Sequence, residues 1–519
     1  MATRTWVGTT DTNWGTSTNW LETAVPTSAD DVVITAIPLN NITLNTSARV
    51  CKSIDFTNFS GMTITMTNTL TVSGNVTLIA GMTIAGSSTL LINAAATLTS
   101  NGKTWPNSMT FAASGSITWV LADNWSVTGN LRFTGNSNDV LNGNTINVGG
   151  NLEINTNAGI PVQGTTNIVM NGTGTWSNTS IGYLVNNLTF NTSGTITISG
   201  TVYKTSGTLT YTAGTIVTTG STLIVCSFVS NNTTVLTLGS VQLNNLTLGG
   251  SGNCTLTLSA NLTVLGNFVT TGNGSNTING NTLYVGGSLS INNSTGIITL
   301  GTTIIELNGT GTWSHSGTGT LSNNLTFNTT GGTITISGTV YKSGTNTITY
   351  TAGTIVTTSS TLIVNGDVTF NTNGMSWNNI SPTGTRILTV NSLLTIGGTL
   401  TVVANLAFAG TSNVNISTLN CITIGVLITL KVGKIYTVTT GMFMTGTSVS
   451  HIVIKSDTGA SYAYFILNQG ATQYNIYLDG TDVDSSSGQT IWTVGGVLTN
   501  TVNWNLGTQP SGSVFMSLI

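Results

Sequence analysis

Short stretches of alternating apolar and polar residues dominate the chain, and turn-forming residues separate them. TITISGTV (195–202), NLTVLGNF (261–268) and TLYVGGSLSI (282–291) are typical. A period of two predicts β-strands that bury one face, and Asn-Gly, Ser-Gly and Gly-Gly pairs between them predict tight turns. No segment carries the 3.6-residue period of an amphipathic helix. The pattern therefore predicts an all-β chain of many short strands.

The strand pattern repeats along the chain. Residues 114–150 align without gaps to residues 251–287, at an offset of 137. NGTGTW at 171–176 recurs at 308–313, and YTAGTIVTT at 211–219 recurs at 350–358. We infer an internal duplication of about 101–225 and 238–364, with a partial third copy from about 373.

A shorter period lies inside each copy. Segments of the form N-L-T-F/L/V begin at Asn187, Asn245, Asn261 and Asn324, with relatives at Asn75, Asn130, Asn151 and Asp367. Many of their separations fit multiples of about 18 to 21 residues, the length of one β-helix coil. Stacked coils would share a core of inward Val, Ile, Leu and Phe, with ladders of Asn and Thr and with Gly at the corners. We therefore predict an elongated right-handed parallel β-helix (solenoid) over 51–440.

A string of β-sandwich domains, each of about 100 residues, is the structural alternative. The helix is preferred because a unit of 137 residues divides into about seven coils, and because regular sandwich spacing is absent.

Tryptophans gather at both ends. Residues 1–50 contain Trp6, Trp14 and Trp20, and residues 441–519 contain Trp492 and Trp504. A solenoid must seal both ends of its apolar core, so the two segments are predicted as an N-terminal cap or attachment segment and a C-terminal cap region. The same five tryptophans are the candidate contacts for a glycan or a partner protein.

Charge is scarce. Charged residues make up 5% of the chain, against about 25% in ordinary soluble proteins. The net charge of -3 leaves no basic stripe for nucleic acid, and the 39% of hydrophobic residues argues against disorder. We find no run of about 18 apolar residues, so we expect no membrane span. The opening MATRTWVGTT lacks the pattern of a signal peptide.

The two copies provide a test for catalytic chemistry. Asp123 aligns with Ala260, Asp139 with Asn276 and Glu153 with Ser290, so none of these charges is shared. His315 and His451 accompany no ligand cluster and no nucleophile motif. We therefore predict no catalytic residue, no cofactor and no enzyme activity.

Three further groups have structural interpretations. Asp479, Asp482 and Asp484 in DGTDVD are the only candidates for a metal site, but a turn is favoured because the EF-hand order is missing. Lys204 and Lys342 recur after a tyrosine and are interpreted as solvated. The cysteines are interpreted as small core residues without a disulfide framework, and they are Cys51, Cys226, Cys254 and Cys421.

Motifs at the two ends resemble a known family. W-V-G-x5-W-x5-W at Trp6, Trp14 and Trp20 precedes PTSADDVVI (26–34) and CKSIDFTNFSG (51–61), and DGTDVDSSSGQTIWTVGGVLTNTVNW (479–504) closes the chain. This arrangement resembles β-helical structural proteins of tailed bacteriophages and uncultured viruses, and more distantly autotransporter passengers. The family usually has a second glycine where this chain has Thr9.

The resemblance implies a virion structural component, such as a tail fibre, a tailspike or a capsid-surface decoration. It implies synthesis in the host cytoplasm, a place on the particle surface, and other virion proteins or a host cell-surface glycan as partners. A homo-oligomer, by analogy a trimer, is also implied. It implies no catalytic residues.

Three functions from different classes follow. The first is a non-enzymatic virion protein that presents an adhesive or spacer surface. The second is a tailspike-like polysaccharide depolymerase, whose carboxylates would have to assemble between subunits. The third is a bacterial surface adhesin. None of the three uses nucleic acid or a membrane as a partner.

Overall fold

The computed structural model describes residues 2–136, 138–156, 161–227, 231–250, 252–294, 298–299, 301–372 and 374–509. Over these residues the chain consists of short β-strands and one 3-10 turn, η1 (Ser17–Asn19), without an α-helix. The prediction of an all-β chain is confirmed.

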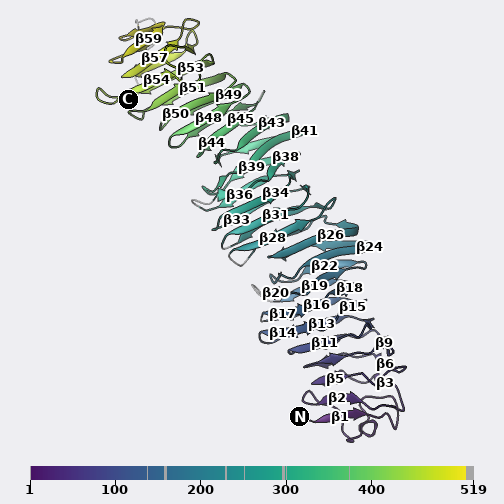
Figure 1. Ribbon diagram of the computed structural model, residues 1–519. Helices are drawn as coiled ribbons and strands as arrows, with labels where there is room; N and C mark the ends of the chain where they lie inside the picture. The colour runs from purple at the N-terminus through teal and green to yellow at the C-terminus, as the bar shows by residue number, and fades with distance from the viewer. Residues whose placement is uncertain are drawn as a thin grey trace. The chain divides into compact units, whose positions relative to one another are not determined.

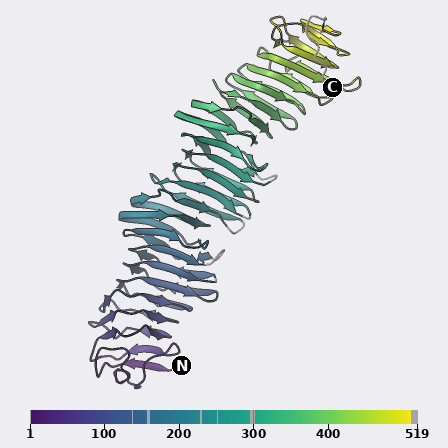
Figure 2. The same cartoon turned by 180° about the vertical axis from the view of Figure 1, so that it is seen from behind.

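The chain divides into two compact units, Met1–Leu262 and Thr263–Ile519. Within each unit the strands lie as parallel rungs, and each strand pairs with strands about one coil earlier and later (Figures 1 and 2). The two units together hold about 21 turns. The predicted parallel β-solenoid is therefore confirmed, whereas its right-handedness and its tryptophan caps stay predictions.

The first unit winds through three stacks of strands. One stack comprises β1 (Thr3–Trp6), β2 (Asp31–Ile34), β5 (Ser53–Asp55), β8 (Val76–Thr77), β11 (Ala96–Thr99), β14 (Ile117–Leu121), β17 (Asp139–Gly143), β20 (Pro161–Gln163), β23 (Tyr183–Leu184), β25 (Thr201–Lys204), β27 (Thr222–Val225) and β30 (Asn245–Gly250). A second comprises β4 (Arg49–Cys51), β7 (Leu70–Val72), β10 (Leu90–Ile92), β13 (Met109–Ala113), β16 (Leu131–Gly135), β19 (Leu152–Thr156), β22 (Gly174–Asn178), β24 (Leu188–Ser199), β26 (Gly207–Val217), β28 (Asn232–Thr237) and β31 (Cys254–Leu258). The third begins with β3 (Ile42–Leu44), β6 (Thr63–Met66) and β9 (Thr83–Gly86), and later holds β12 (Thr104–Trp105), β15 (Trp125–Val127), β18 (Ile146–Val148) and β21 (Ile168–Met170), which joins β24.

The second unit has the same construction. Its longest stack comprises β33 (Phe268–Gly272), β36 (Leu289–Asn293), β39 (Gly311–His315), β41 (Asn324–Ser337), β43 (Thr347–Val356), β45 (Val368–Asn371), β48 (Arg386–Val390), β50 (Leu406–Gly410), β52 (Leu427–Leu430), β54 (Ile452–Ser456), β57 (Leu478–Asp484) and β59 (Leu498–Val502). Another comprises β37 (Ile298–Thr299), β40 (Thr320–Leu321), β42 (Thr339–Lys342), β44 (Thr361–Val364), β47 (Asn379–Pro382), β49 (Leu394–Thr401), β51 (Val414–Cys421) and β53 (Ile435–Thr445). Strand β53 then pairs with both β55 (Ala463–Leu467) and β56 (Thr472–Ile476), and β58 (Ile491–Thr493) pairs with β60 (Trp504–Leu506).

The core consists of columns of inward side chains, one from each coil. In the second stack of the first unit, residues in register are Leu70, Leu90, Met109, Leu131, Leu152 and Trp176, and all are buried. Each such side chain contributes roughly 2 to 3 kcal/mol through the apolar surface that it removes from water. One coil could not bury this surface alone, so the stack is the stabilising unit.

The duplicated segments form equivalent strands. For example, β16 and β33 begin 137 residues apart, at Leu131 and Phe268. Trp176 and Trp313 occupy the same position of β22 and β39, and both are fully buried. Residue 373, where the third copy is predicted to begin, lies outside the described residues.

Asn253 Nδ2 donates to Asn231 Oδ1 at 3.2 Å across 22 residues, as a ladder of identical side chains requires, whereas the asparagines before the N-L-T strands bond to the main chain. Asn130 Oδ1 accepts the main-chain N–H of Asn151 at 2.9 Å, and Asn151 Oδ1 accepts that of Thr175 at 2.8 Å. The same bond, from side chain to the main chain of the next coil, is made by Asn75, Asn187, Asn324 and Asp367. At these six positions the residue that opens the recurring segment therefore joins its coil to the next.

Candidate adhesive surface

The N-terminal tryptophans are part of the core. Trp6, Trp14 and Trp20 are at most 1% exposed, and Trp20 packs edge-on against both other rings, with centroids 5.1 and 4.9 Å away. Trp20 Nε1 donates to the Trp14 carbonyl at 2.9 Å. This corrects their place among the candidate glycan contacts, because rings without exposed surface cannot stack on a ligand.

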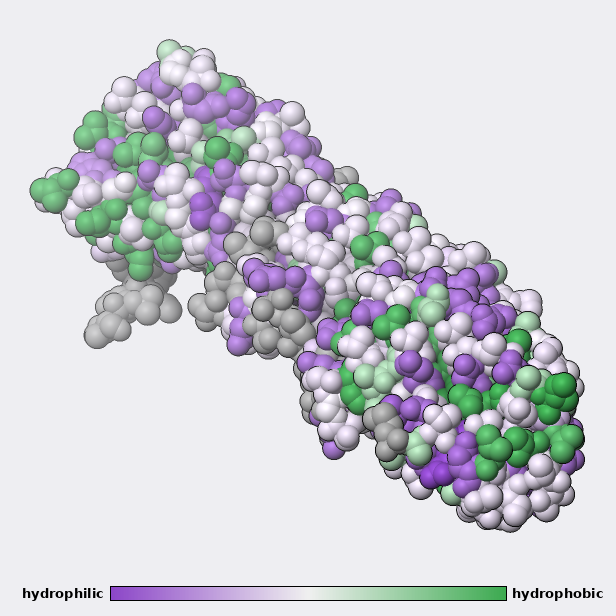
Figure 3. Space-filling model, turned by 60° about the horizontal axis from the view of Figure 1, so that its bottom comes forward, coloured by the Kyte–Doolittle hydropathy of each residue, from purple (hydrophilic) through white to green (hydrophobic). Residues whose placement is uncertain are grey.

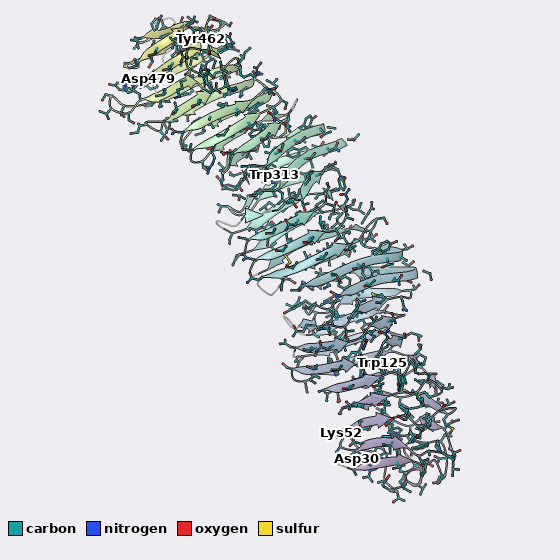
Figure 4. All side chains as sticks on the ribbon, viewed as in Figure 1. Asp30, Lys52, Trp125, Trp313, Tyr462 and Asp479 are labelled. Carbon is teal, nitrogen blue, oxygen red and sulfur yellow. A yellow bond between two sulfur atoms is a disulfide. The ribbon has the colours of Figure 1, made fainter. Side chains whose placement is uncertain are left out.

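Two carboxylates of the first coils, Asp30 and Asp31, have partners within the protein, and Asp30 and Lys52 are labelled in Figure 4. Asp30 accepts hydrogen bonds from the main chain and the hydroxyl of Thr27, which lower the pKa of its carboxyl to about 2. Arg4 Nε lies 3.4 Å from the same carboxylate. Ser53 and Lys52 hold the neighbouring Asp31 in the same way. Both carboxylates are therefore engaged by groups of the protein.

The interpretation of Lys204 and Lys342 as solvated is wrong. Both side chains are fully buried, at the last position of β25 and β42. Lys204 Nζ donates to the carbonyls of Val185, at 3.1 Å, and Ser206, whereas Lys342 Nζ donates to that of Ser343 at 3.3 Å. Burial lowers the pKa of each ammonium to about 7, because a low-dielectric interior disfavours the charged form.

Two more ionisable groups, Asp139, which is buried, and His315, which is half-buried, do not form an acid–base pair. Burial raises the pKa of Asp139 to about 7, and neither carboxyl oxygen has a hydrogen-bond partner among the described residues. His315 Nε2 accepts the Trp313 indole N–H at 3.0 Å, and Nδ1 lies 2.9 Å from the Gly319 carbonyl. Burial lowers the pKa of His315 to about 4, so its imidazole is neutral near pH 7.

Cysteine use also differs from the expectation. Cys226 and Cys254 form a disulfide across a separation of 28 residues, with Cα atoms 5.7 Å apart. Cys51 and Cys421 are buried free thiols, as expected for core residues. Burial raises their pKa values to about 12 and about 11, which keeps both thiols protonated and unreactive.

The acidic segment 479–484 is part of strand β57 rather than a turn. Asp479, labelled in Figure 4, lies 2.7 Å from His451 Nδ1 and accepts the Val497 N–H at 2.7 Å. Asp482 accepts from Asn500 Nδ2 at 2.5 Å, and Asp484 accepts the Ser486 N–H at 2.7 Å. Each carboxylate has its own partner, and the described part of the chain contains no group of three potential metal ligands.

The candidate surface lies on the coils near the end of the second unit. Phe443 of β53 and Tyr474 of β56 are paired in register. The parallel bridge between Ile476 and Val494 places Trp492 of β58 beside Tyr474 in the following coil. These three residues form what we name the aromatic column.

Alternation along the strands directs the aromatic column outward. Met442 and Met444 on either side of Phe443 are buried, and so are Ile491 and Thr493 on either side of Trp492. Tyr474 is 50% exposed, and the other two rings are partly exposed. The ladder continues to Asn420 before Phe443 and to Asn505 after Trp492.

Other residues of these coils differ in exposure. Trp504 is only 6% exposed, because it packs against Phe465 and donates from Nε1 to Ser485 Oγ at 2.8 Å. It is therefore a core residue and not an accessible contact. The C-terminal coils also expose aliphatic loop residues, including Ile422 and Val449, and hydrophobic side chains gather there at the left of Figure 3.

Sequence reasoning selected Trp492 but missed Phe443 and Tyr474. The spacing hid them, because the column advances by 31 and then by 18 residues. A signal was present in Phe443, which lies between two methionines in an alternating strand and must therefore face the opposite way from them.

Two family models match the first part of the chain. Residues 5–114 match a family model described as a domain of unknown function (DUF8693), and residues 106–210 match the model of the G8 domain. No curated protein and no solved structure matches the chain. Among the described residues no helix is long and apolar enough to cross a membrane. The chain is thus similar to these two families over its first coils, and the aromatic column lies outside both matches.

Proposed function

We propose that this protein is a non-enzymatic structural and adhesive solenoid that presents the aromatic column to a partner. A β-solenoid suits such a role, because stacked coils give a stiff frame on which an outward column of side chains is repeated from coil to coil. The observation that carries the proposal is the column itself, three aromatic rings turned outward from three successive coils.

The state of the carboxylates supports a role without catalysis. All 14 acidic residues lie in the described parts of the chain. Every one except Asp139 accepts a hydrogen bond from a group of the protein. Most glycoside hydrolases use two carboxyl groups that flank the scissile bond. Asp139 is buried alone, and its equivalent in the second copy is Asn276.

The finer proposal places the protein on the surface of a bacteriophage particle, as a tail fibre or a capsid decoration. The end motifs support this location by resemblance. The Cys226–Cys254 disulfide also supports it, since disulfides persist on virion and cell surfaces and are rare in a reducing cytosol.

Immunogold labelling tests the proposal. Antibody against the full chain should label the exterior of purified particles, and the purified chain should adhere to host cells without releasing reducing sugar from their polysaccharide. Labelling of bacterial envelopes in place of particles would replace the virion assignment with the adhesin. Release of reducing sugar would overturn the non-enzymatic role.

A further inference from the structure

We propose that the aromatic column binds an uncharged glycan, whose sugar faces stack on the rings of Phe443, Tyr474 and Trp492. The proposal rests on the adhesive function above and names the chemistry of its ligand. It follows from the arrangement of the rings, from the residue beneath Phe443, and from the side chains at the border of the column.

The first argument is the arrangement of the rings. Phe443 and Tyr474 are register partners on parallel strands, and Trp492 follows in the next coil. Paired strands lie about 4.8 Å apart, so the three side chains leave the sheet as close neighbours. Asn475 Nδ2 donates to the Trp492 carbonyl at 3.0 Å, and Gln473 Oε1 accepts the Trp492 N–H at 2.8 Å. These bonds fix the strand that carries the indole to the strand that carries Tyr474.

The second argument is the glycine beneath Phe443. A methyl group on Gly441 would lie only 2.7 Å from ring atom Cε2 of Phe443. The ring therefore lies over Gly441, along its own strand, and occupies the space that any other side chain there would take. The Phe443 ring is only partly exposed, and its position over Gly441 depends on the missing side chain there.

The third argument is the polar border of the column. Thr418, Gly441 and Thr472 form the register column two residues before it, and Asn420 and Asn505 extend it at the two ends. A sugar combines an apolar face of C–H groups with a rim of hydroxyl groups. Rings with hydroxyl groups along one side and amide groups at the two ends match both parts. A purely apolar partner would cover these polar groups without satisfying them, which costs free energy.

The absence of charge selects the class of glycan. The positions two residues after the column are Thr445, Ile476 and Val494. Neither flanking set contains an ionisable side chain, so no cation is placed to pair with a carboxylate, sulfate or phosphate on the ligand. An acidic glycan would lose hydration there without compensation. A neutral polysaccharide meets no such penalty.

The test uses the full chain and polysaccharides of known charge. Insoluble cellulose, chitin and mannan are the neutral probes, and heparin is the acidic probe. We expect the chain to sediment with at least one neutral polysaccharide and not to bind heparin. Tyr474→Ala and Trp492→Ala should each weaken binding by about two- to tenfold, the range expected for the loss of one stacked ring.

Two further variants control the test. Tyr464→Ala removes a tyrosine of similar exposure, 41%, from the neighbouring strand β55, and should bind as the unmodified chain does. Gly441→Val keeps all three rings but displaces that of Phe443, and should also weaken binding. Unchanged thermal unfolding of Tyr474→Ala and Trp492→Ala would show that a loss of binding is not a loss of folding.

The outcomes separate the ligand from the adhesive role. Adhesion to host cells without binding to any neutral probe, or binding to heparin alone, would overturn the glycan class and leave the adhesive function standing. Equal binding by Trp492→Ala, Tyr474→Ala and the unmodified chain would overturn the site. Absence of adhesion to host cells would overturn the proposed function itself.

Discussion

At the scale of single residues, Lys204 and Lys342 show where sequence reasoning failed. Val202 and Lys204 are two positions apart in one strand, so a period of two places both on the same face, and Val202 is buried. Lysine side chains are usually solvated, and the sequence interpretation followed this tendency rather than the alternation along the strand. The protein instead keeps the side-chain stem in the core and directs the amine at main-chain carbonyls.

The buried lysines predict a pH dependence of stability. The folded pKa of each is about 7, against 10.5 for an ordinary lysine, so the unfolded chain binds more protons between these values. The contribution of these two lysines to stability is therefore greatest above about pH 10.5, falls as the pH drops to about 7, and changes little below. Lys204→Met removes the amine that must be protonated. At pH 6 the substitution should raise the free energy of unfolding by up to about 5 kcal/mol, and the unfolding midpoint should rise with it.

The comparison for this prediction is thermal unfolding at two pH values. At pH 10 the amine is neutral in the folded chain and the pH lies close to the unfolded pKa of 10.5, so the stability difference between Lys204→Met and the unmodified chain should shrink to about 1 kcal/mol. Lys342→Met should behave in the same way. Lys434→Met, at a partly exposed position, is the control. An equal shift at pH 6 and pH 10 would contradict the explanation from burial.

At the scale of strands, the recurring asparagine explains how neighbouring coils keep their register. The side-chain oxygen before one strand accepts an N–H near the start of the strand one coil later. Asp367 makes the same bond to Ile387 at 2.8 Å, which shows that the position requires an acceptor rather than an amide. The sequence revealed the recurrence of this residue but not its partner, because the partner is a main-chain group that no residue type marks.

This bond predicts the effect of a substitution at Asn130. Asn130→Ala removes the acceptor for the Asn151 N–H and should lower stability by about 1 kcal/mol. Asn130→Asp keeps an acceptor oxygen in the same place and should lose less. Thermal unfolding of both variants checks the prediction, and equal losses would show that the oxygen is not what matters.

The disulfide is a second device that joins strands. It connects the residue after β27 with the first residue of β31, in the first unit. Ile117 occupies the position of Cys254 in the first copy, so the link is absent there. Sequence could not predict the pair, because the two cysteines have no short-range spacing and only the winding of the coils brings them together.

Loss of the disulfide should destabilise the first unit. Cys226→Ser with Cys254→Ser, or a reductant, should lower its stability by about 2 to 4 kcal/mol, since the crosslink restricts the unfolded chain. Mass spectrometry of an unreduced digest should recover the two linked peptides. Buried Cys51 and Cys421 should resist alkylation until the chain unfolds. Recovery of Cys226 as a free thiol from oxidised protein would contradict the structure.

At the scale of the whole molecule, sequence reasoning was most successful where many residues repeat one rule. Alternation predicted the strands, and the recurring apolar positions predicted the parallel stack that each unit forms. Sequence reasoning was least successful where a residue is buried or exposed contrary to what is usual for its type. The tryptophans near the N-terminus suggested a binding platform because the sequence does not distinguish a buried ring from an exposed one, whereas packing among Trp6, Trp14 and Trp20 does.

The scarcity of charge leads to a last prediction, on salt. Among the described residues four ion pairs join a lysine or arginine to a carboxylate, and most of their members are partly exposed, so each contributes at most about 1 kcal/mol. Stability comes instead from buried apolar columns and from neutral hydrogen bonds between coils, which salt does not screen. Between 50 mM and 1 M NaCl the unfolding midpoint should therefore move by only about 2 °C.

Binding through the aromatic column should persist over the same range, because none of the residues in it is charged. A steep loss of adhesion at high salt would show that the surface which holds the partner is a charged one elsewhere on the chain.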